Sequence, residues 1–273
     1  MHPLLLLSGG VSRRGGAPSG GVGEKACFVR NIKLTIEYDG GAYHGWQIQP
    51  GLRTIQGVVR EQITRITQKK VNLIGAGRTD AGVHALAQVA NFKTESTIDL
   101  TSLQRGLNSL LPPDIVVKRA EEVEEEFHAR FDARSKVYEY HILNQTYPSA
   151  LMRDYAWFIH DELDLSSMRK CGKLLIGSHD FSSFRASGDE SRHSMREVIR
   201  LEIERREDNL IVIAIEANAF LREMVRSIVG TLVDVGRGKT SFGEFKDIFG
   251  AHDRRQAGMT APAHGLFLVE VKY

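Results

Sequence analysis

The sequence is constrained most strongly by side chains that alternate between apolar and polar at every second position. From Asn31 the two sets interleave, and the apolar members are Ile32, Leu34, Ile36 and Tyr38. This period is typical of a strand with one buried and one exposed face. Two more alternating segments, 199–204 and 210–217, flank the turn residues 207–209 and predict a hairpin. The chain is therefore expected to fold around a sheet.

Helical patterns lie between the strand-like segments of the first half. Thr54 is predicted to cap a helix, because apolar residues follow it at helical spacing. These residues are Ile55, Val58, Val59, Ile63 and Ile66. Three further strands are predicted at 71–77, 88–94 and 114–123. One helix is predicted at 99–111, where it ends before a proline pair. The predicted order of the first half is βαββαβ.

A second set of strands and helices is predicted after His128. Its strands are expected at 136–143, in the hairpin and at 266–273, and its helices at 163–177 and from about 220 to 235. Gly177 is the expected C-terminal glycine of the first of these helices. Two α+β halves with mainly antiparallel sheets leave a groove where they meet, which is a common position for a ligand site.

The length of 273 residues fits one large or two medium domains. We expect residues 1–29, which include a glycine-rich stretch, to form a disordered N-terminal extension. Residues 30–132 are then the N-terminal half and residues 133–273 the C-terminal half. No apolar run approaches the 18 or more residues that span a bilayer, so no membrane association is expected.

Composition narrows the class of protein further. Cys27 and Cys171 lie far apart and have no metal-ligand spacing, which argues against a zinc site and a disulfide framework and favours a reducing cytoplasm. The net charge is +2, with acidic residues concentrated at 121–126, so the remaining surface has room for a basic face. The charge thus permits RNA binding without demanding it.

The segment GAGRTDAGVHALAQVANF, residues 75–92, carries the candidate chemistry. Glycines at 75, 77 and 82 allow a tight turn that fixes Asp80 as a candidate nucleophile. A carboxylate is ionised at neutral pH, and a nearby guanidinium is expected to strengthen that preference. The alternative is a turn aspartate that bonds its own backbone. A dinucleotide-binding loop is disfavoured, because Asp80 occupies the place of its third glycine.

Seven segments in the same order resemble the tRNA pseudouridine synthase A family. RTDAGVHA, residues 78–85, is the most specific of their motifs, and the likeness extends over essentially all of the chain after residue 30. The segments are TIEYDGGAYHGWQIQP (35–50), RTIQGVV (53–59), GAGRTDAGVHALAQVANF (75–92), FHARFDARSKVYEYHI (127–142), GSHDFSSFR (177–185), ANAFLREMVRSIVGTLVDVGRGK (217–239) and TAPAHGLFLVEVKY (260–273).

The resemblance implies a fold and a reaction. The expected fold is α+β, with two ferredoxin-like halves forming a mainly antiparallel sheet platform, helices on one face and a central basic cleft. The expected enzyme is a homodimeric isomerase without metal or organic cofactor. It converts uridines at positions 38, 39 and 40 of the tRNA anticodon stem-loop into pseudouridine. The nucleophile attacks either C6 of the base or C1′ of the ribose, and these alternatives stay open.

The resemblance also assigns roles to four residues. Asp80 is the expected nucleophile, and Arg226, which lies on an apolar helix and needs an acidic partner, is its expected catalytic partner. A structural ion pair with another acid is the alternative for Arg226. Tyr138 is expected to stack on the target base, although Tyr140 shares its strand face. Arg78 is expected to bind the RNA, through a phosphate or by orienting Asp80.

The remaining motif residues are expected to have structural roles. His84, His128 and His179 lack metal-ligand spacing and are interpreted as packing and loop residues. Tyr43 and Trp46 either support the loop of Asp80 or contact RNA. The chain departs from the family pattern at Gly41, Ser227 and Met259, where threonine, asparagine and proline are usual. Of these departures, Ser227 bears on the rate of the reaction more than on its type.

Two other classes of function are alternatives to this reading of the chain. A non-catalytic RNA-binding module with the same topology would not need Asp80, and the chain lacks the RNP1 motif of the common version. An oxidoreductase would bind NAD, which we do not expect for a chain that lacks the complete glycine fingerprint.

Overall fold

The computed structural model describes residues 29–188, 191 and 193–273. The predicted extension at 1–29 lies outside the described residues except for Val29, which precedes the first strand. The first half has the predicted βαββαβ order. Its elements are β1 (Arg30–Tyr38), α1 (Ile55–Thr67), β2 (Ile74–Gly75), β3 (His84–Thr94), α2 (Leu100–Leu110) and β4 (Ile115–Val123).

The second half follows with more strands and short helices than the sequence predicted. Strands β6 and β7 and helix α5 were not predicted. The elements are β5 (Ser135–Asn144), β6 (Trp157–Ile159), α3 (Leu165–Gly172), β7 (Gly177–Asp180), β8 (Met195–Arg205), β9 (Leu210–Ala217), α4 (Met224–Gly236), α5 (Phe242–Gly250) and β10 (Leu266–Lys272). Short 3-10 turns connect several of them.

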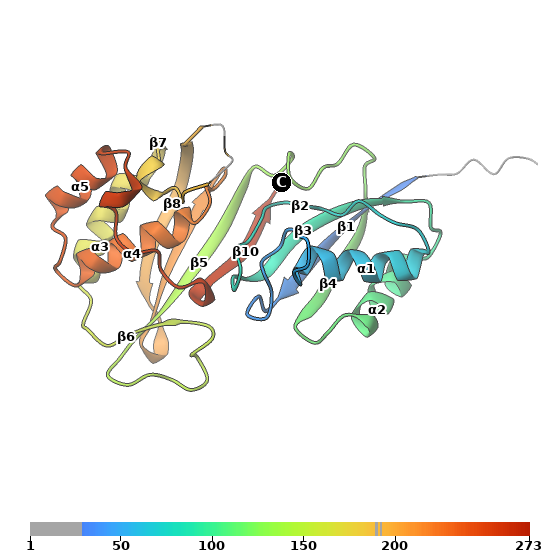
Figure 1. The fold of residues 1–273 in the computed structure, drawn as a ribbon, viewed down its shortest axis with the longest axis horizontal. Coiled ribbons are helices and arrows are strands. Elements are labelled where there is room, and N and C mark those ends of the chain that lie inside the picture. Colours follow the sequence, from blue (N-terminus) through green and yellow to red (C-terminus); the bar gives the residue numbers. More distant parts are fainter. Residues whose placement is uncertain (1–28, 189–190, 192) are drawn as a thin grey trace, which may run out of the picture.

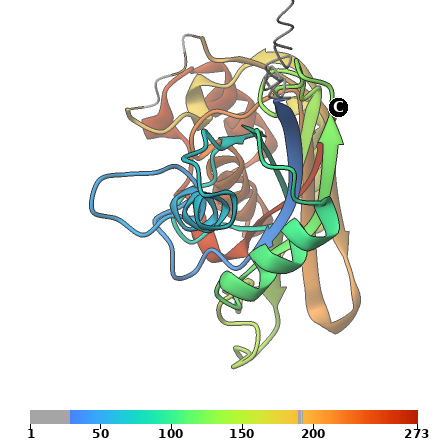
Figure 2. The ribbon, with the colours of Figure 1, turned by 90° about the vertical axis from the view of Figure 1, so that its right-hand side faces the viewer.

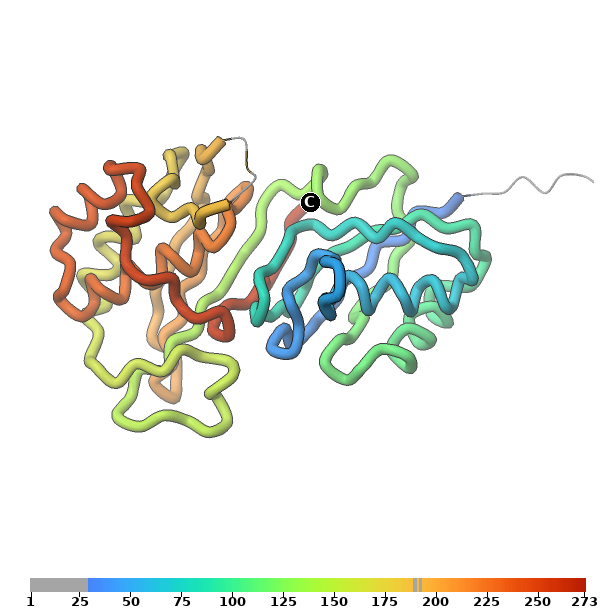
Figure 3. Tube along the Cα trace, viewed as in Figure 1, coloured from blue at the N-terminus to red at the C-terminus, as the bar shows by residue number. Residues whose placement is uncertain are grey.

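All described strands belong to one ten-stranded sheet, in the order β4-β1-β3-β10-β5-β9-β8-β7, with β2 beside β3 and β6 beside β5. Most pairs are antiparallel; β10 with β3 and β5 with β6 are parallel. The last strand, β10, lies between the halves, because Phe267 pairs with His84 of β3 and with Glu139 of β5. Figures 1 and 3 show this red segment between the two halves. The predicted α+β fold class is confirmed.

The helices cover one face of the sheet, which is seen edge-on in Figure 2. A single apolar cluster under these helices extends through both halves. Its largest fully buried side chains include Trp46, Tyr140, Phe92, Phe181 and Phe184. Burial of this cluster is the main force that holds the halves together, since apolar area removed from water stabilises the fold. No helix in the described part of the chain has the length and apolarity needed to cross a bilayer.

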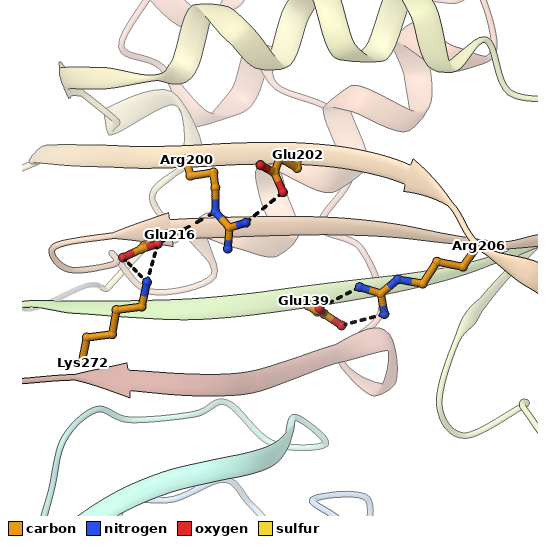
Figure 4. Close-up of polar contacts among 6 residues, drawn as sticks. All are labelled: Glu139, Arg200, Glu202, Arg206, Glu216 and Lys272. Carbon is orange, nitrogen blue, oxygen red and sulfur yellow. Dashed lines mark hydrogen bonds and ion pairs between the residues drawn. The ribbon is translucent and has the colours of Figure 1, made fainter.

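Ion pairs occupy the opposite face of the second half. Ile215 belongs to the core cluster, so Glu216, the next residue on β9, faces the other side of the sheet. Its carboxylate accepts hydrogen bonds from Lys272 and Ser135 at 2.9 and 2.7 Å. Figure 4 shows Glu216 and Lys272 beside Arg200 and Glu202, and shows the guanidinium of Arg206 paired with Glu139. This face is therefore polar and cross-linked between strands.

Two predictions about local structure were wrong. Gly177 does not end a helix: α3 ends at Gly172, a 3-10 turn follows, and Gly177 begins β7 with a positive φ of 109°. Ile199 does not share the buried face of Leu201, because a bulge between Val198 and Arg200 shifts the alternation. Ile199 is consequently 48% exposed, whereas Val198 is 1% exposed.

The bounds of two other elements differ from prediction. Within 71–77 only Ile74 and Gly75 pair in the sheet, because the chain then leaves β3 to form the loop of Asp80. Helix α4 begins at Met224 instead of about residue 220, since Glu223 adopts a left-handed conformation with φ of 59°. This residue sets the point at which α4 starts, three positions before Arg226.

Candidate active site

Asp80 lies on the loop that joins β2 to β3. The amide of Val83 donates a hydrogen bond to the carbonyl oxygen of Asp80 at 3.2 Å, which closes a tight turn. Gly82 in this turn has a φ of +77°, a conformation that side chains other than glycine rarely adopt. The turn thus fixes the backbone of Asp80, as its glycine content predicted.

A second loop supports the loop of Asp80 from beneath. The amide of Trp46 donates to the carbonyl oxygen of Thr79 at 3.0 Å, and the hydroxyls of Thr79 and Tyr38 share a hydrogen bond of 2.8 Å. Trp46 is 1% exposed and Tyr43 is buried, with its hydroxyl donating to Asp114. Of the two roles considered for Tyr43 and Trp46, the structure therefore favours support of the loop.

Helix α4 brings a guanidinium to Asp80 from the second half of the chain. Nη1 of Arg226 lies 3.4 Å from Oδ2 of Asp80, although the two residues are 146 positions apart. Nε of Arg226 donates to the carbonyl oxygen of Ala261 at 2.7 Å, and the amide of Ala261 donates back to the carbonyl oxygen of Arg226 at 3.1 Å. Glu223 lies 3.8 Å from the same Nη1. Arg226 therefore links Asp80 to the segment before β10.

The electrostatics of Asp80 differ from the expectation. Burial raises the pKa of its carboxyl, Arg226 lowers it, and Glu223 raises it, so that the pKa lies above its ordinary value. The expected strengthening of the ionised form by a guanidinium is present but does not prevail, because the loss of hydration outweighs it. Ionisation of Asp80 is therefore less favourable than that of an ordinary aspartate.

Tyr138, a residue of β5, lies near Asp80. Burial raises the pKa of Tyr138 well above its ordinary value, with further contributions from Tyr38 and from the charge of Asp80. Its ring meets that of Phe220 edge-on, with centroids 5.0 Å apart. Tyr140, two residues along, donates its hydroxyl to the carbonyl oxygen of Pro262 at 2.8 Å. Tyr140, which is 0% exposed, is thus committed to packing, whereas Tyr138 is 6% exposed and lies within reach of the charge of Asp80.

Arg78 precedes Asp80 by two residues on the same loop, and its side chain is exposed. The guanidinium that the structure pairs with Asp80 belongs to Arg226, and the RNA-binding role of Arg78 stays a prediction. Of the four residues expected in the site, three lie together and the fourth lies at the surface of the loop.

Comparisons with known proteins show the family to which the chain belongs. The family model described as tRNA pseudouridine synthase matches residues 34–132 and 172–273. The chain belongs to the tRNA pseudouridine synthase family. It is 50% identical over 245 residues to tRNA pseudouridine synthase A of Thermoanaerobacter sp. (strain X514). It is 47% identical to tRNA pseudouridine synthase A of Acetivibrio thermocellus. Both alignments cover 90% of this chain and 100% of the relative.

A likeness to solved structures is weaker. An archaeal box H/ACA sRNP complex of Nop10 and Cbf5 matches with a TM-score of 0.34 and 15% identity, over 74% of this chain and 44% of that one. The assignment to the tRNA pseudouridine synthase family therefore depends on the sequence relatives. It confirms the family expected from RTDAGVHA and, with it, the expected enzyme class, an isomerase.

Sequence reasoning missed two charged residues that act on Asp80 and a third, Lys136, that lies against Gly77 of the same loop. Arg222 lowers and Glu223 raises the pKa of Asp80, so both charges act on the carboxyl. Their position in LREMVRS, just before Arg226, could have indicated that they lie near Asp80. Lys136 was also missed, although its position on β5 puts it on the same face as Tyr138 and Tyr140; it is only 9% exposed.

Two departures from the family's motifs lie close to this site. Ser227 follows Arg226 and is fully buried; its hydroxyl has no hydrogen-bond partner within the described ranges. It therefore does not orient the guanidinium through a hydrogen bond. The other departure, Met259, exposes its side chain, while its backbone carbonyl packs against Gly230 of α4.

The three motif histidines have structural contacts. His84 is buried and stacks on Phe267 of β10, with ring centroids 4.8 Å apart. His128 accepts hydrogen bonds from the amides of Arg130 and Phe131 at 3.2 and 3.3 Å. His179 bonds the carbonyl of Ile176. Over the described ranges, no group of three His, Cys, Asp or Glu side chains is arranged to hold a metal ion.

Gly45 offers a test of how precisely the loop must be placed. Its φ is +79°, and a Cβ there would lie 2.5 Å from the carbonyl oxygen of Thr79 and 3.0 Å from the carbonyl carbon of Asp80. Gly45→Ala is expected to displace Asp80 and to lower the rate about 100-fold, since a shift of about 1 Å has effects of that order. Single-turnover assays at saturating enzyme measure this loss.

Gly51 provides a matched control for this substitution. Its φ is +73°, but nothing lies within 4 Å of the position that a Cβ would take there, so Gly51→Ala introduces the same backbone strain without a clash. Both variants are expected to lose about 1 kcal/mol of stability from the left-handed conformation. Only Gly45→Ala should lose activity. Equal activities of the two variants would show that the contact beneath Asp80 does not position it.

Proposed function

We propose that this chain isomerises uridine to pseudouridine at positions 38, 39 and 40 of the tRNA anticodon stem-loop, with Asp80 as nucleophile. The observation that carries the proposal is the Asp80–Arg226 pair at 3.4 Å, next to Tyr138, at the junction of the two halves. Family membership supplies the reaction class, and the names of the relatives supply tRNA as substrate.

The chemistry begins with attack by the ionised Asp80 carboxylate on the target nucleoside, at C6 of the base or C1′ of the ribose. A covalent intermediate divides one difficult exchange into two easier steps. The bond between N1 and C1′ breaks, the uracil turns, and C5 forms the new bond to C1′. Loss of the C5 proton and gain of a proton at N1 complete the isomerisation, and Asp80 is released.

The surrounding residues have distinct roles in this proposal. Arg226 holds the Asp80 carboxylate and opposes the effect of burial on its charge. Tyr138 stacks on the base and retains it while it is detached. Its raised pKa keeps its hydroxyl protonated at neutral pH. Arg78, exposed on the loop, contacts an RNA phosphate. Substrate and product have the same composition, so the reaction needs no redox cofactor or group donor.

Recognition of the stem-loop requires extrusion of the target nucleotide. Flipping costs a few kcal/mol, which stacking and phosphate contacts offset. Arg78, Arg222, Arg226 and Lys136 lie on or beside the loop of Asp80 and would line the central basic cleft that such a substrate needs. Because several tRNA sequences share the shape of the arm, shape is expected to dominate over base reading.

The assembly and organisation of the enzyme complete the proposal. We infer a cytoplasmic homodimer in which each chain comprises an N-terminal half, 30–132, and a C-terminal half, 133–273. The last strand of the C-terminal half also pairs with β3 of the N-terminal half, which makes the sheet continuous between them.

The direct test is incubation of the purified protein with unmodified tRNA, followed by mapping of pseudouridine at single-nucleotide resolution. Conversion at positions 38 to 40 is expected. Conversion elsewhere in the tRNA would contradict the proposed target, and no conversion in any tRNA would contradict the proposed activity. A thermal shift on addition of NAD would point instead to the oxidoreductase alternative.

A further inference from the structure

Lys136 is a buried cation for which the described part of the chain offers no anionic partner. The residue is 9% exposed, and its ammonium has no ion pair or hydrogen bond with any residue that the structure describes. Other lysines of the sheet differ in this respect, since each pairs with a glutamate: Lys33 with Glu121, Lys93 with Glu125, Lys118 with Glu37 and Lys272 with Glu216. Lys136 thus differs from the paired lysines of the sheet.

The position of Lys136 places it beside the loop of Asp80. A Cβ at Gly77 would lie 3.2 Å from Cε of Lys136, so the end of the lysine side chain lies against the residue that precedes Arg78. Lys136 and Tyr138 are two positions apart on β5 and therefore face the same side of the sheet. The lysine and the proposed base-stacking tyrosine are thus neighbours, about 7 Å apart along the strand.

The surroundings of Lys136 make its charge unfavourable in the absence of a ligand. Its partners in the sheet are Ala217 on β9 and Val271 on β10, neither of which offers a charge. Burial lowers the pKa of Lys136, and the positive charge of Arg130 lowers it further. A buried ammonium that lacks a counter-ion destabilises the fold. This arrangement is consistent with a site that awaits an anion from outside the chain.

We propose that Lys136 binds the phosphodiester next to the target uridine and so positions that nucleotide over Tyr138 and Asp80. The inference rests on the proposed function, because the anion is part of the RNA substrate. Lys136 is accordingly a positioning residue for the reaction.

The test uses Lys136→Met, which keeps the apolar stem and removes the charge, and Lys136→Arg, which keeps the charge. Binding of unmodified tRNA is measured between about 50 and 200 mM salt, together with kcat and KM for pseudouridine formation. Lys136→Met is expected to weaken binding about 10-fold. The slope of log Kd against log salt should also fall by about 0.7 to 0.9, the value of one phosphate contact. Because the phosphodiester does not react, the loss in kcat/KM is expected mainly in KM, with a smaller loss in kcat from the less well positioned nucleotide.

Lys118→Met is the matched control, because it removes the charge of a lysine on edge strand β4 that already pairs with Glu37. Its salt slope should equal that of the wild type, and Lys136→Arg should retain most of the affinity. The unfolding midpoint of Lys136→Met should not fall, since the substitution removes an unpaired buried charge.

Two results would overturn the role of Lys136. One is an unchanged salt slope and Kd in Lys136→Met; the other is a lowered unfolding midpoint with unchanged binding, which would assign the residue to the fold alone. A wild-type protein that binds tRNA without forming pseudouridine would contradict the proposed function instead, while the binding measurements would still decide the phosphate contact.

Discussion

Replacement of Asp80 with asparagine is expected to reduce pseudouridine formation by at least about 10⁴-fold, because the amide preserves the shape of the side chain but cannot act as the nucleophile. Binding of tRNA should change by only a few-fold, since stacking on Tyr138 and contacts with phosphates remain. Single-turnover assays with the enzyme in excess, together with filter binding of unmodified tRNA, measure the two quantities separately. Retained conversion would reject Asp80 as the nucleophile.

The stability of the same variant supplies an independent control. The folded-state pKa of Asp80 is raised, so its contribution to stability is present at low pH and is lost as the pH rises through that pKa. At neutral pH the ionised carboxylate gives the native state no net advantage over the unfolded state. The unfolding midpoint of Asp80→Asn should therefore equal or exceed that of the wild type. A large decrease would mean that lost activity reflects unfolding.

Replacement of Arg226 with methionine is expected to lower kcat by about 10² to 10³-fold, the range found when one preorganised charged contact is removed from a reaction centre. The pKa of Asp80 should rise further, because the guanidinium is the main group that lowers it against the effect of burial. Less carboxylate is then present at a given pH. The acidic limb of the profile of kcat/KM should consequently move to higher pH, as measured from about pH 5 to 9.

Arg226→Lys separates the charge from the geometry. Lysine keeps a positive charge near Asp80 but loses the Nε donor that reaches the carbonyl oxygen of Ala261 at 2.7 Å. Its acidic limb should stay near that of the wild type, while its kcat falls to an intermediate value. If the acidic limb of the kcat/KM profile of Arg226→Met also stays at the pH of the wild type, the guanidinium does not control the ionisation of Asp80.

Much of the local structure could be predicted because it depends on neighbouring residues. The alternation from Ile32 to Tyr38 reappears as the buried pattern of β1, and the side chain of Thr54 caps α1 by accepting from the amide of Gly57. The hairpin around residues 207–209 joins β8 to β9 as expected. In each case the periodicity or the capping residue carries the information within a short segment.

Features that depend on distant pairing were not predictable. The bulge that turns Ile199 outward arises from the register of β8 against β9, and alternation alone cannot reveal it. The central position of β10 follows from its pairing with β3 and β5, which no local pattern encodes. Gly177 satisfied the rule for a helix end but serves a strand that begins with positive φ.

The candidate site also has features that the sequence predicted and features that it did not. The motif pointed to Asp80, and the apolar surroundings of Arg226 indicated a need for an acidic partner; the fold brings the two together. The direction of the pKa shift of Asp80 was not foreseen, because it depends on how much water the folded chain removes from the carboxyl. The face of Lys136 could have been inferred from its alternation in step with Tyr138 and Tyr140, but the loop at Gly77 that lies against it comes from a distant part of the chain.

The central place of strand β10 has a consequence for synthesis of the protein. A ribosome produces β3 and β5 long before β10, the segment that lies between them, and Ala261, which holds Arg226, also precedes β10 closely. Contacts between distant parts of a chain form late in folding. The nascent protein therefore completes the sheet that carries the candidate site only once β10 has left the ribosome, and products terminated before this strand are expected to be inactive.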